Sequence, residues 1–422
     1  MLIRKGGVER VTQRAYKYRF YPTGEQERAF RRTFGATRKV WNRGLGLRSE
    51  AWRERQERVS SYDLIKMLPA LKKELPYLGE VSAVALQQAL LNQDKAFKNF
   101  FDGCKGLRPR VGYPRFKTRN SRKSFRLVGT ALKFEAGRVS VVGFKDAPLN
   151  VTWSRPLPAG VKPSSATISL DASGRWHISL LCDETVDELP VAEPARAIGI
   201  DLGLKTFAVL SDGTEIAHPK LLAKKAARLA RYQRQMSRRQ GARKGETQSN
   251  RYKKAKLRVA RQHAKVTDAR RDFLHKASTD IVRRYDTIAI EDLAVKNMVK
   301  NRRLAKSISD SGWAEFRTQL EYKTDWYGKR LVVIDRFAPT SKTCSECGEK
   351  STKLALTDRE WVCAGCGTLH DRDLNAARNI LAAGLAVAAR GEDVRPKRKP
   401  RASALGGRLS SLKREPAEVT AA

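Results

Sequence analysis

Residues 197–213 read AIGIDLGLKTFAVLSDG, and this stretch decides the fold that the sequence predicts. The uncharged apolar runs 197–200 and 207–210 are typical of buried strands, and the turn signal Ser-Asp-Gly follows the second run. We therefore predict a β-hairpin. Asp201 lies where the first run ends, and burying a carboxylate is costly unless it is paired or binds a cation. An aspartate that only caps a turn is the alternative interpretation of this residue taken alone.

The overall charge indicates a polyanionic partner. The 422 residues include 85 Lys and Arg against 44 Asp and Glu, which gives a formal net charge of +41. Such an excess resists compaction unless a polyanion neutralises it, and nucleic acid is the commonest such partner. The longest apolar run, 380–389, is shorter than the ~18 residues of a membrane-spanning helix, so we expect no membrane partner.

The first hundred residues predict one strand followed by a small helical bundle. Aromatic and basic residues alternate over 16–22 with the period of a strand. Apolar stripes at helical spacing follow, and we expect them to form the core of the bundle. The first stripe comprises Phe30, Phe34, Trp41 and Leu45; the second helix covers 62–75 with a break at Pro69; the third covers 81–101, with Leu86, Leu90, Phe97 and Phe101 on its stripe.

A basic and aromatic segment comes next. It begins as YPRFK at 113–117 and continues, as a predicted loop, through Arg119, Arg122, Lys123 and Arg126. Interleaved cations and aromatic rings suit RNA or single strands, because cations neutralise phosphates and rings stack on bases. Short strand-like runs follow at 138–142, 167–170 and 176–181, which predicts a small β-domain with the helical bundle inserted after its first strand. Residues 184–194 are predicted to be a linker.

The region behind the hairpin is strongly basic. Residues 220–285, interrupted near 241–249, predict two antiparallel helices whose Lys and Arg excess favours a phosphate-contacting face over a balanced solvated one. A further strand at 287–291 ends on Glu291. A helix at 311–327 and a strand at 331–334 complete this part.

Four cysteines have the spacing of a structural zinc site. They are Cys344, Cys347, Cys363 and Cys366, with 15 residues between the two pairs. Four thiolates close a tetrahedral Zn²⁺ without an open position, so this ion would hold a loop together. The remaining Cys104 and Cys182 have no partner in the sequence, so we expect them to be ordinary buried or partly buried residues. The cysteine usage as a whole indicates metal in a reducing cytoplasm. His370 follows closely, but a site with four cysteines does not need it.

The positions of three carboxylates can each be explained by local structure, but a shared site explains the three together better. Residues 370–380 read HDRDLNAARNI and predict a helix, with Asp371 as its N-cap and Asp373 in its first turn. Asp201 and Glu291 end predicted strands. Two strands that present an Asp and a Glu, with a later helix that presents an Asp, are the components of an RNase H-like nuclease centre. Such a centre holds two Mg²⁺ ions about 3.5 to 4 Å apart at a phosphodiester.

The order of these motifs resembles the RuvC-like core of the transposon-encoded TnpB family, relatives of type V CRISPR effectors. The resemblance lies in GIDLGLKTFAVLSDG, IAIEDL, the PTSKT that precedes the cysteine pairs, and HDRDLNAARNI. It extends over nearly the whole chain, because FYPTGEQ, GYPRFK, DFLHKAS and SDSGWAEF are also similar to motifs of that family. A zinc ribbon between the Glu and the last Asp makes this order specific.

The resemblance implies an α+β multidomain fold. The implied parts are a β-barrel wedge domain at 1–22 and 112–190, a helical recognition domain at 23–111, a RuvC-like nuclease domain at 195–338 and 368–390, and a zinc-ribbon insertion at 339–367. Residues 391–422, rich in Arg, Pro, Ala and Ser, resemble nothing folded and are expected to be disordered.

The resemblance also implies a function: RNA-guided DNA endonuclease of an insertion sequence. A noncoding RNA from the transposon end would pair with target DNA beside a short adjacent motif, in the prokaryotic cytoplasm at the nucleoid. Asp201, Glu291 and Asp373 would hold two catalytic Mg²⁺ ions, and the cysteines one Zn²⁺. Matching Asp373, not Asp371, follows from the D-x-N-A-A pattern of the family, and the roles of Asp371, Arg372 and Asp292 stay open. We expect the protein component to be a monomer.

The nucleic-acid contacts that this implies are spread over the first half of the chain. By resemblance, Tyr62, Gln87 and Thr130 would face DNA near the adjacent motif. Ala83 and Val84 depart from the bulkier or charged residues of the family, so the recognised motif could differ. From the basic and aromatic segment we add Tyr113, Arg115 and Lys117 as nucleic-acid-binding candidates.

Three other functions remain open at this point. A transposase or resolvase could use the same carboxylate core without RNA, although the zinc ribbon between the second and third carboxylates argues against it. A nuclease-inactive RNA-guided repressor would be expected to lack a carboxylate, yet all three are present. A zinc-ribbon nucleic-acid-binding protein without activity is the third.

Overall fold

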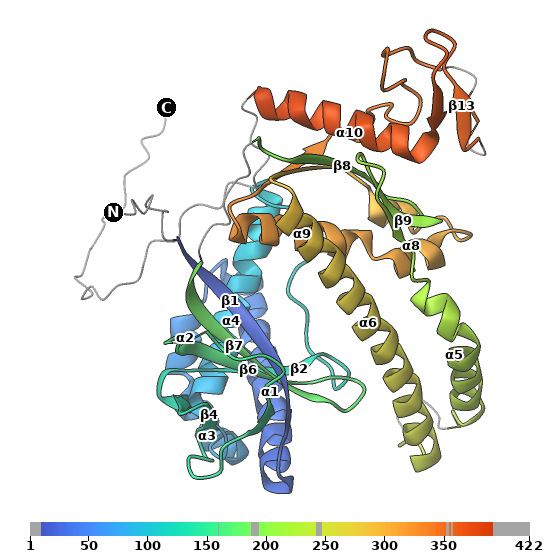
Figure 1. Cartoon of the computed structure of the whole chain (residues 1–422). Coiled ribbons are helices and arrows are strands. Elements are labelled where there is room, and N and C mark those ends of the chain that lie inside the picture. Colours follow the sequence, from blue (N-terminus) through green and yellow to red (C-terminus); the bar gives the residue numbers. More distant parts are fainter. Residues whose placement is uncertain are drawn as a thin grey trace, which may run out of the picture.

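The computed structural model describes residues 10–158, 160–186, 194–241, 247–351, 354–355 and 358–390. Within these ranges the protein is a mixture of helices and strands that includes two five-stranded sheets (Figure 1). The predicted disordered tail at 391–422 lies outside the described residues, and so does 187–193 of the predicted linker. The linker prediction is wrong for 184–186, which are strand residues.

The first sheet is antiparallel, with the strand order β2-β6-β7-β1-β5. Its strands are β1 (Arg10–Tyr21), β2 (Lys123–Val128), β5 (Asn150–Thr152), β6 (Pro163–Leu170) and β7 (Trp176–Val186), and β3 (Leu132–Glu135) pairs with β4 (Arg138–Val141) in a separate hairpin. The alternation in β1 is confirmed, because Tyr16, Tyr18 and Phe20 are buried on one face. The prediction of a loop through Arg126 is wrong from Lys123 onward, since that residue begins β2.

Helices lie between β1 and β2 in the chain, as predicted. They are α1 (Gly24–Arg55), α2 (Ser61–Lys66), α3 (Leu68–Glu74), the 3₁₀ turn η1 (Pro76–Leu78) and α4 (Ala83–Cys104), while the 3₁₀ turn η2 (Gly129–Ala131) follows β2. Thr23 begins α1 with a capping box to Gln26. The predicted break at Pro69 falls two residues late: the chain leaves α2 at Met67, and Pro69 lies in the first turn of α3, where its missing N–H costs nothing.

The stripe of α1 is buried as predicted: Phe30 and Phe34 pack on the sheet beside Trp176. The stripe of α4 is buried only in its first half. Leu86 and Leu90 are core residues, whereas Phe101 is 49 % exposed. The expectation that Phe101 belongs to the core is therefore wrong, because its ring packs only against Phe97 and Phe100 of its own helix among the described aromatic contacts.

The second sheet contains the predicted hairpin. Its order is β10-β9-β8-β11-β12, with β8 (Ala197–Asp201), β9 (Thr206–Leu210), β10 (Glu215–Ala217), β11 (Thr287–Glu291) and β12 (Arg330–Ile334). β8, β11 and β12 are parallel, whereas β9 runs antiparallel to β8 and β10 antiparallel to β9. The apolar runs 197–200 and 207–210 are strands because helices cover both faces of this sheet.

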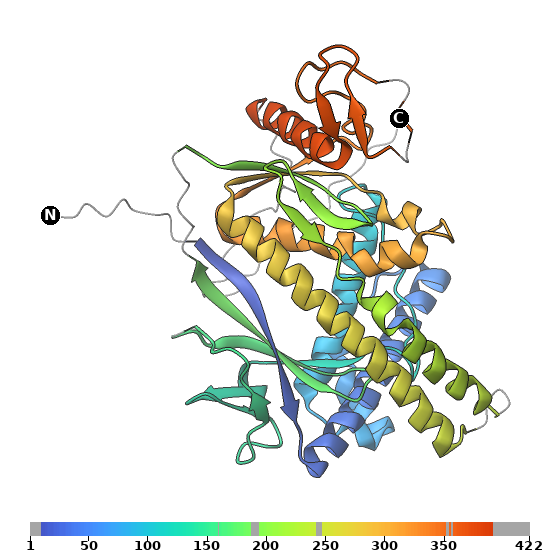
Figure 2. The ribbon, with the colours of Figure 1, turned by 45° about the vertical axis from the view of Figure 1, so that its right-hand side comes forward.

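The two faces of the second sheet are covered by different helices. α10 (Arg372–Ala389) crosses one face, and α6 (Asn250–Arg284) and α9 (Trp313–Trp326) lie on the other (Figure 1). α5 (Leu221–Arg238) pairs with α6, and the pair extends away from the sheet (Figure 2). The predicted helix at 311–327 is α8 (Ala305–Ser311) and α9 joined at Gly312, whose φ of 71° is unfavourable for other residues; α7 (Val295–Met298) precedes them.

A small two-stranded sheet lies beside the start of α10. It consists of β13 (Glu360–Val362) and β14 (Leu369–Asp371), paired antiparallel. Over the described residues, no helix is long and apolar enough to cross a membrane.

Candidate active site and metal centre

Three carboxylates gather at one end of the second sheet. Asp201 is the last residue of β8 and Glu291 the last of β11, and these strands are parallel neighbours with Ile200 opposite Ile290. Their carboxyl ends therefore meet at one edge. Asp373 reaches this edge from the first turn of α10.

Two glycines bring α10 close enough to do this. A Cβ on Gly199 in β8 would lie 2.1 Å from the carbonyl oxygen of Ala377, and one on Gly384 in α10 would lie 2.5 Å from the Cβ of Ala289 in β11. The backbones of helix and sheet thus pack directly against each other. Glycine is required at both positions because the helix and the strands approach so closely. This close packing sets the distance between Asp373 on α10 and the strand ends.

The electrostatics of the three carboxylates favour an added positive charge. Burial, and then the charges of Glu291 and Asp373, raise the pKa of Asp201 to about 7, although Arg372 opposes this. Oxygen ligands of this kind are the ones that Mg²⁺ prefers, so the donor set fits a divalent cation. Among the residues that the structure describes, the three carboxylates are not found as a group compact enough to hold a metal ion, unlike the four cysteines.

Two residues that the sequence did not single out hold these carboxylates. Thr340 Oγ1 donates a hydrogen bond of 2.7 Å to Glu291 Oε1. Arg359 Nη1 lies 3.3 Å from both carboxylate oxygens of Asp373. Both come from the segment around the cysteines, and only tertiary structure brings them to the strand ends.

The neighbouring charged residues have structural roles. Asp371 accepts a hydrogen bond of 2.8 Å from the Leu374 N–H, which confirms it as the N-cap of α10. Arg372 is buried and donates to the Ala355 carbonyl oxygen at 2.6 Å. Asp292 pairs with two arginines, Arg317 and Arg336, instead of facing the three carboxylates. Burial alone would raise the pKa of Asp292, but hydrogen bonds from both arginines hold it below its usual value.

The four cysteines form a compact cluster. Their sulfurs all lie within 4.8 Å of one another, with Cys344 to Cys366 at 3.7 Å and Cys347 to Cys363 at 3.5 Å. Zinc–sulfur bonds of about 2.3 Å in a tetrahedron place neighbouring sulfurs about 3.8 Å apart, so the arrangement fits a metal ion of this kind. The cluster could hold one metal ion.

His370 is a part of this centre that the sequence did not assign. It is buried, its Nε2 lies 3.0 Å from Cys344 Sγ, and its ring packs on Trp361. An imidazole N–H donated to a thiolate orients the ligand and stabilises its charge. The proximity of His370 to the cysteine pairs was the one signal in the sequence.

Two asparagines of α10 tie the cysteine cluster to the carboxylates. Asn375 accepts from the Ser345 N–H at 2.9 Å and donates to the Thr343 carbonyl oxygen at 2.8 Å. Asn379, one turn later, donates to the carbonyl oxygens of Thr340 and Thr343 at 2.7 and 2.6 Å. The same helix therefore presents Asp373 and holds the loop that carries Cys344.

The six residues predicted to contact nucleic acid lie in different parts of the chain and differ in how exposed they are. Tyr62 on α2 is 72 % exposed, Gln87 on α4 is half-buried, and Thr130 is exposed in η2. Tyr113 packs edge-on against Phe97 and is partly exposed. Arg115 is exposed. No nucleic acid is present to test these six residues; the sixth, Lys117, lies with its Nζ 3.7 Å from the centre of the Trp41 ring.

Comparison with known proteins places the chain in a family. Three family models match it: "Probable transposase" over residues 179–302, "Cas12f1-like, TNB domain" over 313–380, and "Helix-turn-helix domain" over 12–57. A Streptomyces pristinaespiralis protein named "Putative RNA-guided DNA endonuclease" is 48 % identical over 97 % of this chain and 98 % of its own length. The chain belongs to the TnpB family. An Escherichia coli (strain K12) member, "Putative RNA-guided DNA endonuclease InsQ", is 34 % identical over 96 % of this chain and 98 % of its own length.

The solved structures that resemble this chain have much lower sequence identity to it than these relatives do. A Cas12f1 chain, solved in a complex with sgRNA and target DNA, is 15 % identical with a TM-score of 0.48, over 88 % of this chain and 98 % of that one. CasPhi-2 bound to crRNA is 10 % identical with a TM-score of 0.44, over 90 % and 99 %. The region matched by the helix-turn-helix model is, in this structure, strand β1 and the single long helix α1.

Proposed function

We propose that this chain is an RNA-guided DNA endonuclease encoded by an insertion sequence, with Asp201, Glu291 and Asp373 as its catalytic residues. The observation that carries the proposal is the meeting of these three carboxylates at one sheet edge, where burial and then the charges of Glu291 and Asp373 raise the pKa of Asp201. The two relatives that match nearly the whole chain are both named as RNA-guided DNA endonucleases, which supports RNA guidance as part of this proposal.

The catalytic role that we propose for each residue follows from its contacts. Asp201, Glu291 and Asp373 would hold two Mg²⁺ ions, which activate a water and stabilise the leaving oxygen when bound. Thr340 orients Glu291 by donating to Oε1, which leaves the other carboxylate oxygen free to turn toward a cation. Arg359 pairs with Asp373, and its positive charge would also favour a phosphate held at these carboxylates.

For the cysteine cluster we propose one structural Zn²⁺. Four thiolates leave no position for a substrate, so this ion holds the segment that supplies Thr340 and Arg359. His370 supports the cluster through Cys344. The sequence-based division stands as part of the same proposal: a wedge domain at 1–22 and 112–190, recognition helices at 23–111, a nuclease domain at 195–338 and 368–390, and the zinc ribbon at 339–367.

The proposed partners are a noncoding guide RNA and double-stranded target DNA, bound by one copy of the protein. Pairing between guide and target supplies the sequence information, and the protein needs mainly to hold the backbone of the duplex. The net charge of +41 fits this division of labour. Tyr62, Gln87 and Thr130 remain our candidates for contact with the adjacent DNA motif.

The decisive experiment reprograms the guide. The protein is purified with its RNA, the terminal segment of that RNA is replaced, and plasmids that carry the new complementary sequence are tested for cleavage. We expect cleavage to follow the new sequence, and Asp201→Ala to abolish it while RNA and target binding persist. Cutting by Asp201→Ala at the wild-type rate would refute the catalytic assignment, and strand joining without RNA would favour the unguided transposase.

A further inference from the structure

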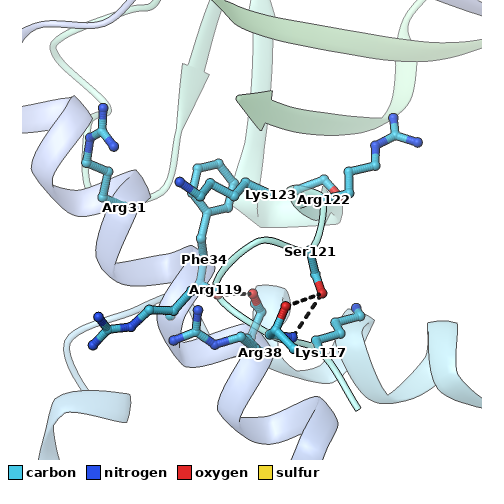
Figure 3. A pocket seen from close by; sticks show the side chains of 12 residues that line it. Arg31, Phe34, Arg38, Lys117, Arg119, Ser121, Arg122 and Lys123 are labelled. Atoms are coloured by element: carbon cyan, nitrogen blue, oxygen red, sulfur yellow. Dashed lines mark hydrogen bonds between the residues drawn. The ribbon is translucent and has the colours of Figure 1, made fainter. Parts of the chain in front are cut away.

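A pocket of about 270 Å³ lies between α1 and the segment that leads into β2 (Figure 3). Helix α1 supplies one wall with Arg31, Phe34, Gly35, Thr37 and Arg38, and residues 117–124 supply the other. None of the proposed catalytic carboxylates or cysteines lines it. The pocket is therefore a second feature of the molecule, separate from the nuclease centre.

The lining is strongly and one-sidedly charged. It contains six cationic side chains and no carboxylate: Arg31, Arg38, Lys117, Arg119, Arg122 and Lys123. Arg31 pairs with Glu27 on its own helix, whereas the structure gives the other five no ion-pair partner within the described ranges. Like charges gathered in one pocket repel one another. An anion bound there would reduce this electrostatic repulsion.

The wall formed by residues 117–124 is anchored to α1. Trp41 Nε1 donates to the Arg115 carbonyl oxygen at 3.0 Å. The Asn42 side chain makes two hydrogen bonds with the Lys117 backbone, one donated to the carbonyl oxygen at 2.9 Å and one accepted from the N–H at 2.8 Å. Burial lowers the pKa of Lys117. Specific contacts thus position the backbone at the start of this segment.

The aromatic residue of the pocket is not available to stack on a base. Phe34 is only 8 % exposed, and its ring already stacks on Trp176 with 5.7 Å between centroids. The turn at the loop is closed by the Thr118 N–H donating to Ser121 Oγ at 2.9 Å, which leaves hydroxyls and cations at the surface of the pocket. Cations and hydroxyls of this kind suit phosphate oxygens, which they bind irrespective of base sequence.

Gly35 leaves the backbone of α1 uncovered in the wall of the pocket. It lies inside a helix, where glycine costs about 0.5–1 kcal/mol relative to alanine. A Cβ at Gly35 would meet nothing within 4 Å, so packing within the protein does not require glycine. A nucleic-acid strand in the pocket could therefore approach the helix backbone closely at Gly35.

From these observations we infer that the pocket binds a backbone phosphate of a nucleic-acid strand, without regard to base sequence. The inference rests on the proposed function only for the identity of the polyanion. The strand is either the RNA or the DNA of the complex, since the phosphate chemistry is the same in both. The pocket fixes the path of that strand between α1 and β2.

The first test compares two charge-matched triple variants of the full chain. Arg119→Gln, Arg122→Gln and Lys123→Gln change the pocket, while Arg53→Gln, Lys66→Gln and Lys73→Gln remove the same formal charge from other exposed positions. Each protein is titrated with a short single-stranded RNA and with a short DNA duplex across a range of salt. The pocket variant should lose about tenfold more affinity than the control for one probe, with a salt slope shallower by about 0.7 to 0.9 per lost phosphate contact.

The arm that responds identifies the strand. A loss confined to RNA assigns an RNA phosphate, and a loss confined to the duplex assigns a DNA phosphate. Equal losses for the pocket and control variants with both probes would overturn the inference. Because the probes are synthetic, this result is independent of whether the protein uses a guide or cuts DNA.

A second comparison uses two glycines of α1. Gly35→Ala and Gly46→Ala both place a methyl group where nothing lies within 4 Å, but only Gly35 lines the pocket. Both variants should melt at a higher temperature than the wild type. Gly35→Ala alone should weaken binding of the responsive probe, and equal affinity of the two variants for both probes would contradict the pocket as a binding site.

Discussion

Asp201 shows at the scale of one residue how a catalytic position opposes stability. Its pKa is raised by burial and by the charges of Glu291 and Asp373 to about 7. A carboxylate with a raised pKa in the folded state stabilises the protein at low pH, and this contribution is lost as the pH rises from about 4 through 7. Near pH 8, without divalent cations, the charged group therefore destabilises the fold.

Asp201→Asn should accordingly stabilise the protein near pH 8 in the presence of a chelator, by about 2 kcal/mol, because the amide removes the repulsion. The gain should shrink at about pH 5, where the carboxyl is already protonated. Thermal melting at both pH values measures it. Asp292→Asn is the matched control with the opposite sign, since it removes ion pairs to Arg317 and Arg336. A variant less stable than the wild type near pH 8 would count against our description of Asp201.

Thr340 offers a test of orientation by a single hydrogen bond. Thr340→Val keeps the shape and removes the donor to Glu291 Oε1. We expect the cleavage rate to fall by about tenfold or more while RNA and DNA binding stay the same, as for other residues that orient metal ligands. Thr343→Val is the control, because the Thr343 hydroxyl bonds only the Pro339 carbonyl oxygen. Unchanged cleavage in Thr340→Val would show that Glu291 needs no such support.

Sequence and structure reveal different residues of the candidate site. Asp201, Glu291 and Asp373 could be predicted because each stands at a strand end or a helix start that local patterns define. Thr340 and Arg359 could not, since each acts through contact with a carboxylate far away in the chain. The catalytic role of the three carboxylates stays a prediction.

At the scale of elements, the packing of α10 on the sheet sets the geometry. Gly199→Ala would force a methyl group to within 2.1 Å of the Ala377 carbonyl oxygen. We expect a loss of about 1–3 kcal/mol of stability and a larger loss of cleavage, because Asp373 moves with the helix. Gly46→Ala serves as a control in open space. A melting temperature equal to that of the wild type would mean that α10 tolerates displacement.

The cysteine cluster makes a second prediction at this scale. Cys363→Ser should lower the zinc content and remove cleavage while most of the fold survives, because Asn375 and Asn379 tie the cluster to the helix that carries Asp373. Cys104→Ser, outside the cluster, is the control. The prediction that Cys104 is at least partly buried is wrong, because it ends α4 at an exposed position, whereas Cys182 is buried as predicted. Metal analysis, thermal melting and cleavage assays together test this. Full zinc content with full activity in Cys363→Ser would contradict the assignment.

The elements themselves differ in how well the sequence predicts them. The strands β8, β9 and β11 were predictable because continuous apolar runs with turn signals have few other interpretations. β2 was missed since Lys123 and Arg126 give it the composition of a basic loop, and only pairing with β6 makes it a strand. Phe101 was assigned to the core because spacing alone cannot show whether another element packs against the end of a helix.

At the scale of the whole molecule, the contacts between distant segments were beyond sequence reasoning. The Arg14 guanidinium of β1 lies 4.3 Å from the centre of the Trp326 ring in α9. Arg175, at the start of β7, pairs with Asp268 of α6. Such contacts join the part of the protein built on the first sheet to the part built on the second. No local pattern in the sequence predicts them.

The charge of the whole molecule predicts strong dependence on salt and nucleic acid. With a net charge of +41, the protein freed of RNA should precipitate or bind unrelated RNA at low salt, and its affinity for any strand should fall steeply as salt increases. Light scattering of nuclease-treated and untreated protein across a salt series measures this. A nuclease-treated sample that stays soluble and unbound at low salt would show that the charges are balanced in some other way.

The most direct test of the central proposal is the identity of the RNA that the protein carries. The chain is expressed with the DNA that flanks its gene, purified at high salt, and the copurifying RNA is sequenced. We predict a single discrete species that maps to the end of the gene and the transposon end, with a terminal segment that matches no part of the element. A mixture of host RNAs in proportion to their abundance would contradict the guided function. It would mean that the protein binds RNA only through its positive charge.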